Sequence, residues 1–237
     1  MGIPPRPRRA PRPGPQGRRL HRLVHSEASR DRPIAAARGP LLGRFPQSQV
    51  LRDRSHRDLF HINTVFLRRW FVLFFINHGT RRVHIAGITR HPTSFWITQQ
   101  ARNYLMDLGD HAKSIKFLIR DRGAYFTDSF DAVFQAIGVH VLPTLPRVPR
   151  MNAITERWIG SCRREATDRI LITGERHLRL VISEYAKHYN QHRPHRSLGQ
   201  RAPDLLTEHG PPTTTDNTRI HRHDRLGGLI HEYRCAA

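Results

Sequence analysis

The chain has 237 residues, of which 40 are Lys or Arg and 19 are Asp or Glu, so its formal net charge is +21. This composition excludes an acidic disordered chain and a collagen, and no apolar run approaches the length of about 18 residues that a membrane span needs. The two cysteines, Cys162 and Cys235, are too few for a disulfide scaffold. The surplus of positive charge favours a polyanionic partner, most simply nucleic acid.

The charge is concentrated at the N-terminal end. Residues 1–57 contain 14 Arg, 3 acidic residues and 9 of the 17 prolines, which predicts a disordered basic segment. Three interpretations of this segment stay open. It is an unstructured leader read from upstream or off-frame sequence of a gene rich in G and C, a basic arm that follows a phosphate backbone, or an Arg-rich targeting peptide.

Beyond residue 57 the apolar pattern predicts alternating strands and helices. Three consecutive strands with short links indicate an antiparallel meander, and a helix, a strand, a helix and a strand follow before two final helices. The expected strands are 59–67, 70–76, 81–89, 116–120 and 139–142, and the expected helices are 93–108, 129–137, 152–170 and 175–189. Prolines 143, 146 and 149 indicate a stiff linker before the third helix. This order predicts a mixed α/β layered fold.

Single residues in these elements also suggest roles. Thr93 or Ser94 can cap the first helix, and Gly109 can end it. Asn152 is expected to cap the third helix. Trp158 and Cys162 are expected in the core rather than at a binding surface.

Two carboxylates fall where functional groups gather in α/β folds. Asp121 follows an apolar strand, and Glu156 lies in the first turn of the third helix. Carboxylates delivered from a strand end and a helix start can share a divalent cation, and two such ions about 3.5–4 Å apart are a common device for phosphoryl transfer. Taken alone, however, Asp121 can merely end a strand, and Glu156 can be a favourable acid at a helix start.

Four segments carry a more specific signal: Asp58–Val65 (DLFHINTV), Phe117–Arg122 (FLIRDR), Pro149–Trp158 (PRMNAITERW) and His188–Leu198 (HYNQHRPHRSL). Together they resemble the integrase core of bacterial insertion-sequence transposases, over about residues 58–203. The resemblance implies a ribonuclease-H-like fold, with a mixed five-stranded sheet flanked by helices. The expected organisation is a disordered segment at 1–57, the core at 58–203 and a C-terminal tail at 204–237.

The resemblance also implies a catalytic set of Asp, Asp and Glu that binds two Mg²⁺ ions, or Mn²⁺, when active. Asp121 and Glu156 match the second and third positions, and the first falls on Asn63, where the motif has Asp. An amide oxygen is a neutral and weaker ligand, so a weakened site is expected. Asp58 lies five positions earlier, and strand alternation puts it on the face opposite to Asn63.

The implied partner is DNA, and the implied state is a homo-oligomer on DNA, in the bacterial cytoplasm with the nucleoid. No membrane and no small-molecule cofactor are expected. Five arginines are candidates for contacts with DNA phosphates: Arg157, Arg163, Arg164, Arg193 and Arg196.

The leading functional hypothesis is a transposase or integrase that transfers DNA 3′ ends. One alternative is an inactive, truncated transposase remnant that binds DNA without joining it, since residues 1–57 show no helix-turn-helix pattern. Another is an Arg-rich nucleic-acid-binding protein whose core is only a scaffold.

Overall fold

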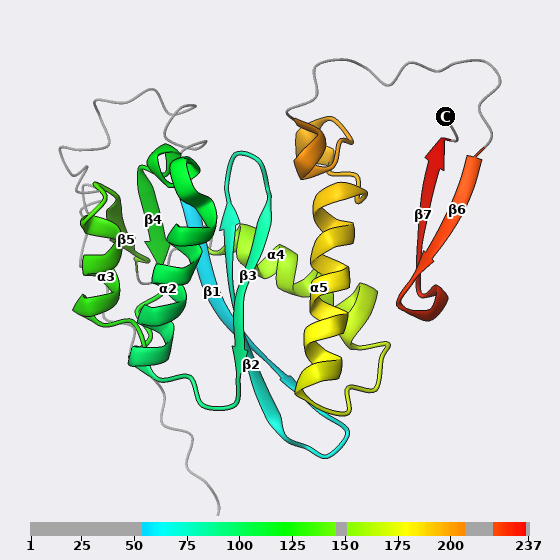
Figure 1. Ribbon diagram of the computed structural model, residues 1–237, viewed down its shortest axis with the longest axis horizontal. Coiled ribbons are helices and arrows are strands. Elements are labelled where there is room, and N and C mark those ends of the chain that lie inside the picture. The colour runs from blue at the N-terminus through cyan, green and yellow to red at the C-terminus, as the bar shows by residue number, and fades with distance from the viewer. Residues whose placement is uncertain (1–53, 146–150, 207–219, 236–237) are drawn as a thin grey trace, which may run out of the picture. The chain divides into compact units, whose positions relative to one another are not determined.

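The computed structural model describes residues 54–145, 151–206 and 220–235 (Figure 1). Most of the predicted disordered segment and residues 146–150 of the proline linker lie outside the described residues. The strands are β1 (Arg54–Asn63), β2 (Arg69–Asn77), β3 (Val83–Thr89), β4 (Phe117–Arg120), β5 (His140–Pro143), β6 (Ile220–Arg225) and β7 (Ile230–Cys235). The helices are α2 (Ser94–Leu108), α3 (Asp128–Gln135), α4 (Ala153–Cys162) and α5 (Glu175–Gln191).

Five strands form one mixed sheet in the order β3-β2-β1-β4-β5. The meander β1-β2-β3 is antiparallel, whereas β4 pairs in parallel with both β1 and β5. This confirms the predicted five-stranded sheet. In the pair of β1 with β4, Arg54 lies opposite Phe117 and His56 lies opposite Ile119. Continuing that register by two residues brings Asp58 opposite Asp121, directly after the end of β4.

The sheet separates two apolar clusters because β2, an interior strand between β3 and β1, is buried on both faces. Residues 72–76 of β2 are at most 1% exposed, as its unbroken apolar run predicts. The α4–α5 cluster comprises mainly Phe60, Ile62, Val72, Phe74, Ile76, Trp158, Leu178, Ile182 and Tyr185. The α2–α3 cluster comprises mainly Leu73, Phe75, Ile97, Tyr104, Leu118, Phe130 and Phe134. Figure 1 accordingly shows the two helix pairs on opposite sides of the sheet.

The helix ends agree with the sequence in part. The Thr93 hydroxyl accepts a hydrogen bond from the Trp96 amide at 3.2 Å, and Gly109 ends α2 with a φ of 52°. The prediction that Asn152 caps α4 is wrong, because its side chain makes no capping hydrogen bond. Instead, the Thr155 hydroxyl donates to the Asn152 carbonyl at 2.8 Å. Trp158 and Cys162 are fully buried, which confirms their predicted place in the core.

The third predicted helix is shorter and less regular than its pattern indicates. α4 ends at Cys162, and a π-helical turn, Arg163–Thr167, replaces the α-helix predicted to reach Ile170. The Asp168 amide closes this turn by donating to the Arg163 carbonyl at 2.9 Å, five residues back. Such turns insert one residue into a helix and are frequent near functional sites.

Two elements extend beyond the expected core, one on each side. β1 starts at Arg54, four residues before the expected boundary, because residues 54–56 already pair with β4. Within the expected tail, β6 and β7 form an antiparallel hairpin, which is bonded to α5 through Arg225 and Glu184. Glu232 on β7 is 1% exposed, and its carboxylate lies 3.2 Å from Nδ1 of His188 and accepts from Nε of Arg225, also at 3.2 Å. No helix among the described residues is long and apolar enough to cross a membrane.

The burial of Arg57 in the sheet is energetically unfavourable. Its side chain is fully buried, with Cζ 2.7 Å from the centroid of the Phe126 ring and 4.5 Å from that of Phe130. None of its three side-chain nitrogens has a hydrogen-bond partner among the described residues. Burial, and then the charge of Arg120, lower the pKa of Arg57 well below its ordinary value. A buried cation without hydrogen bonds destabilises a fold.

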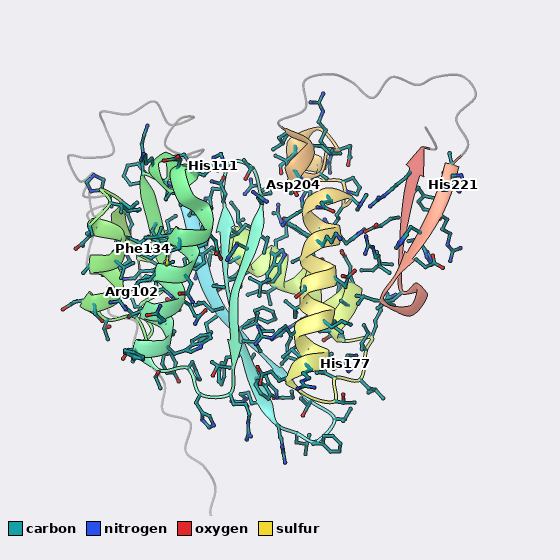
Figure 2. All side chains as sticks on the ribbon, in the orientation of Figure 1. Arg102, His111, Phe134, His177, Asp204 and His221 are labelled. Carbon is teal, nitrogen blue, oxygen red and sulfur yellow. The ribbon has the colours of Figure 1, made fainter. Side chains whose placement is uncertain are left out.

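We therefore expect Arg57→Met to raise the free energy of unfolding by at least about 1 kcal/mol, because it fills the same space without a charge. Urea denaturation measures the change. The matched control is Arg102→Met on the exposed surface of α2, labelled in Figure 2, where a change within about 0.5 kcal/mol is expected. An Arg57→Met protein less stable than the wild type would contradict the expected cost of the buried guanidinium.

A second prediction concerns His78, which follows β2 and is 9% exposed. Its ring stacks on that of His56, with centroids 5.6 Å apart, and burial lowers the pKa of His78 from 6.5 to about 4. The folded protein thus favours neutral His78, so this part of the stability is complete above pH 6.5 and is lost as the pH falls towards 4. The decrease amounts to about 3 kcal/mol, at about 1.36 kcal/mol per pH unit over 6.5 − 4 units.

Denaturation between pH 7 and 4 tests this, because His78→Phe keeps a ring but removes the titration. The variant should lose less stability than the wild type over this range. His111→Phe, at an exposed position, serves as the control. Parallel losses in the wild type and His78→Phe would show that another group causes the acid sensitivity.

Candidate active site

Asp121 is held at the carboxyl edge of the sheet by two hydrogen bonds. Its Oδ1 accepts from the Arg122 amide at 2.7 Å and from the Thr144 hydroxyl at 3.1 Å. Arg122 in turn donates through Nε to the Thr144 carbonyl at 2.9 Å, which ties the end of β4 to the end of β5. The carboxylate is therefore fixed in direction while Asp121 stays exposed.

Asp58 shares the sheet face of Asp121. Asp58 has the same strand parity as Phe60 and Ile62, which pack into the α4–α5 cluster. Leu118 packs into the α2–α3 cluster, so Asp121, three residues later, alternates to the other face, that of α4. Together with the parallel register, this parity brings the two carboxylates side by side beneath α4.

The electrostatics of Asp58 agree with this geometry. Burial raises the pKa of the Asp58 carboxyl to about 6, and the negative charge of Asp121 adds to the rise. Three groups oppose the rise by stabilising the anion: the Leu59 amide, which donates to Oδ1 of Asp58 at 2.7 Å, the positive charge of Arg57, and the nearby Thr155 hydroxyl. A carboxylate pair with this mutual repulsion favours a divalent cation, whose charge offsets it.

Glu156 is delivered to the same side by α4. Its amide donates to the Asn152 carbonyl at 2.9 Å in the first turn, and its side chain is exposed. The preceding residue, Thr155, is fully buried beside Asp58. Within the described residues, no three His, Cys, Asp or Glu side chains are arranged to hold a metal ion. The structure thus brings Asp58 and Asp121 together, with Glu156 on the adjoining helix turn but not converged on them.

Asn63 lies elsewhere, which corrects its expected position beside Asp121. It is the last residue of β1, where the strand pairs only with β2 because β4 has already ended. Its exposed side chain lines a separate cavity of about 320 Å³ with His61, Arg163 and Asp168. The alternation that puts Asp58 and Asn63 on opposite faces is correct, but Asp121 belongs to the face of Asp58. The signal that finds Asp58 is its shared parity with the buried Phe60 and Ile62.

The five predicted DNA-contacting arginines are not equivalent. Arg163 donates to the His61 carbonyl at 3.3 Å, and Arg164 is exposed. Arg193 is paired with Glu165, at 2.7 Å from Nη2 to Oε1. Arg157, Arg193 and Arg196 line one pocket, and Arg81 from the turn between β2 and β3 joins them. Arg81 is remote in sequence from the other three, so no motif indicates it.

Comparison with known proteins agrees with this architecture. Residues 137–203 match the family model of the integrase core domain. The insertion element IS476 uncharacterized 39.2 kDa protein of Xanthomonas euvesicatoria is 36% identical over 84 residues, which are 35% of this chain and 24% of that protein. The match thus spans about a quarter of the length of this curated relative. These findings confirm the resemblance to the integrase core of insertion-sequence transposases.

Solved structures confirm the ribonuclease-H-like fold. A chain of the simian T-cell lymphotropic virus intasome in complex with PP2A regulatory subunit B56 gamma superposes with a TM-score of 0.51 at 16% identity, covering 78% of this chain and 67% of that chain. The HTLV-2 integrase catalytic core domain in complex with magnesium, in its trimeric form, superposes with a TM-score of 0.52 at 12% identity. The match covers 65% of this chain and 95% of that chain. At these identities the likeness concerns the fold alone.

The site makes a prediction about metal binding. Asp58→Asn should weaken Mn²⁺ binding at least about tenfold, because it removes a charged ligand of the carboxylate pair. Asn63→Asp is the control, because it adds a negative charge to the same strand from which Asp58→Asn removes one. It should leave the affinity for Mn²⁺ unchanged within about twofold. Calorimetric titration measures both. A gain of affinity in Asn63→Asp with no loss in Asp58→Asn would reverse the assignment.

Proposed function

We propose that this chain is a transposase- or integrase-like protein that transfers DNA 3′ ends during DNA integration, with Asp58, Asp121 and Glu156 as its catalytic residues. The observation that carries the proposal is the β1–β4 register, since it sets two carboxylates side by side on the sheet face covered by the helix of Glu156. The integrase core match and the fold support the class of reaction.

The donor set fits Mg²⁺, with Mn²⁺ as a substitute, because it consists of carboxylate oxygens. Bound there, the ions would activate a 3′-hydroxyl and stabilise the leaving oxygen. The residues of the chain divide the remaining work. Asp58 and Asp121 would hold the ions, the Leu59 amide and Thr155 orient Asp58, and Glu156 on the first turn of α4 would supply the third carboxylate.

The proposed partner is DNA, engaged as a homo-oligomer because integration pairs two DNA ends. Among the predicted contacts, Arg157, Arg164 and Arg196 are exposed and are the direct candidates for phosphates. Arg163 and Arg193 already bond to protein groups, so their part in DNA binding is to support the surface.

The expected weakening by Asn63 loses its basis when Asp58 is the first carboxylate. The alternative of an inactive remnant then keeps only one of its two grounds, the missing helix-turn-helix pattern of residues 1–57, because a charged ligand takes the place of the neutral amide. With Asp58 in place the chain keeps three acidic side chains for the ions. The neutral side chain of Asn63 then affects the rim of a different cavity.

A strand-transfer assay with Mg²⁺ or Mn²⁺ tests the proposal. The wild type should join DNA ends. Asp58→Asn or Glu156→Gln should each lower the rate of joining more than about 100-fold, because loss of a metal ligand costs more than loss of a group that only supports one. Asn63→Asp should change the rate less than about threefold. Joining by Asn63→Asp alone would establish the inactive-remnant alternative. DNA binding without joining in any form would instead favour the Arg-rich scaffold.

A further inference from the structure

A pocket of about 270 Å³ lies next to the first turn of α4 and is built from four separate segments. Arg81 comes from the turn between β2 and β3, Arg157 from α4, Tyr189 from the end of α5, and Arg196 from the loop that follows. Because Arg157 directly follows Glu156, the pocket and the candidate active site share one helix turn.

The pocket holds more positive charge than its surroundings neutralise. Arg193 at its edge is paired with Glu165 through two bonds, at 2.9 Å from Nε and 2.7 Å from Nη2. The other three guanidinium groups, of Arg81, Arg157 and Arg196, form no salt bridge with any carboxylate of the described residues. Three unneutralised arginines around one cavity favour an anion with several oxygens.

Arg81 is held in place by its backbone and has an unused donor. Its φ of 64° is left-handed, and its amide donates to the Asn77 carbonyl at 2.9 Å. Its Nη1 is buried without a hydrogen-bond partner among the described residues. Burial, together with the charge of Arg157, lowers the pKa of Arg81, as expected for two cations that share a cavity. A bound oxyanion would satisfy the donor and relieve the repulsion.

The aromatic wall adds neutral polar groups. The ring of Tyr189 meets that of His195 edge-on, with centroids 4.5 Å apart. Burial raises the pKa of Tyr189 to about 12, so the phenol keeps its proton, and burial lowers the pKa of His195, so the imidazole is neutral near pH 7. The positive charge of the pocket therefore comes from arginines and is constant around neutral pH.

We propose that this pocket binds a backbone phosphate of DNA through Arg81, Arg157 and Arg196. The inference rests on the proposed function, because it takes DNA as the partner and adds where one strand is fixed. A phosphate in this pocket anchors the strand at the helix turn that carries Glu156. Arg193 positions the wall of the pocket through its ion pair with Glu165 and does not contact the phosphate.

The experiment measures binding of a labelled DNA duplex to the full chain by fluorescence anisotropy, in metal-free buffer and over a range of salt concentrations. Arg81→Gln and Arg196→Gln should each weaken binding at least about tenfold. Each should also lower the slope of log affinity against log salt by about 1, the mark of a lost phosphate contact. Arg81→Lys should restore most of the slope, and Arg102→Gln on α2 should change neither quantity.

Two further measurements distinguish an internal DNA phosphate from a terminal 5′-phosphate and from free phosphate. Duplexes with a 5′-phosphate or a 5′-hydroxyl should bind equally, because an internal phosphate is recognised. Inorganic phosphate at equal ionic strength should compete only weakly. Strong competition by inorganic phosphate, or dependence on the 5′-phosphate, would overturn the backbone assignment.

The experiment distinguishes failure of the proposed strand-transfer function from failure of the proposed phosphate pocket. Metal-free binding does not require catalysis, so reduced slopes in both variants support the pocket even when no strand transfer occurs. Unchanged slopes in variants of a wild type that joins DNA would overturn the pocket alone. Circular dichroism of each variant checks that it folds, and Arg81→Lys covers the case in which Arg81→Gln does not.

Discussion

The parallel pairing of β1 with β4 determines where chemistry can take place in this molecule. The two strands run in the same direction, and their register, continued beyond the last pair of His56 with Ile119, brings Asp58 in the middle of β1 next to Asp121 after the end of β4. The third acid comes from α4, which covers this face because Trp158 packs against Phe60 and Phe74. The same aromatic contacts that bury the core therefore orient the helix that carries Glu156.

This arrangement has an electrostatic cost that explains its polar surroundings. Asp58 is half-buried, and its neighbour Asp121 has the same charge, so both effects oppose ionisation of Asp58. The Leu59 amide and the Thr155 hydroxyl stabilise the anion, and a divalent cation would do so further. On the other face of the sheet, Arg57 lies within electrostatic range of Asp58, Asp121 and Asp131, and it lacks hydrogen bonds. The positive charge of Arg57 therefore offsets part of the repulsion between Asp58 and Asp121.

The apolar pattern predicted the five strands of the sheet because its signals are local, whereas the ribonuclease-H-like fold followed from the family resemblance. The apolar run 70–76 indicated a buried strand and the short links indicated a meander, and the structure confirms both. The first carboxylate was assigned to Asn63 because register between strands distant in sequence cannot be obtained from a motif alone. A slip of an odd number of residues exchanges the two faces of a strand, and Asp58 and Asn63 differ by five. No sequence pattern indicates Arg81, because the packing of α5 against β3 brings its turn near α4. The Asn152 side chain does not cap α4 because its backbone is helical, with φ −96° and ψ −4°, whereas a capping residue is typically extended.

The π-helical turn after α4 changes the direction in which its side chains point. Each added residue rotates everything after it by about 100°, the angle per residue of a helix with 3.6 residues per turn. Glu165 lies inside this turn and faces α5, where it accepts from the Tyr185 hydroxyl at 2.9 Å and binds Arg193. In a continuous α-helix the residues that follow the turn would emerge at a different angle. The extra residue in the turn therefore sets the direction in which Glu165 faces α5, and with it the ion pair that neutralises Arg193.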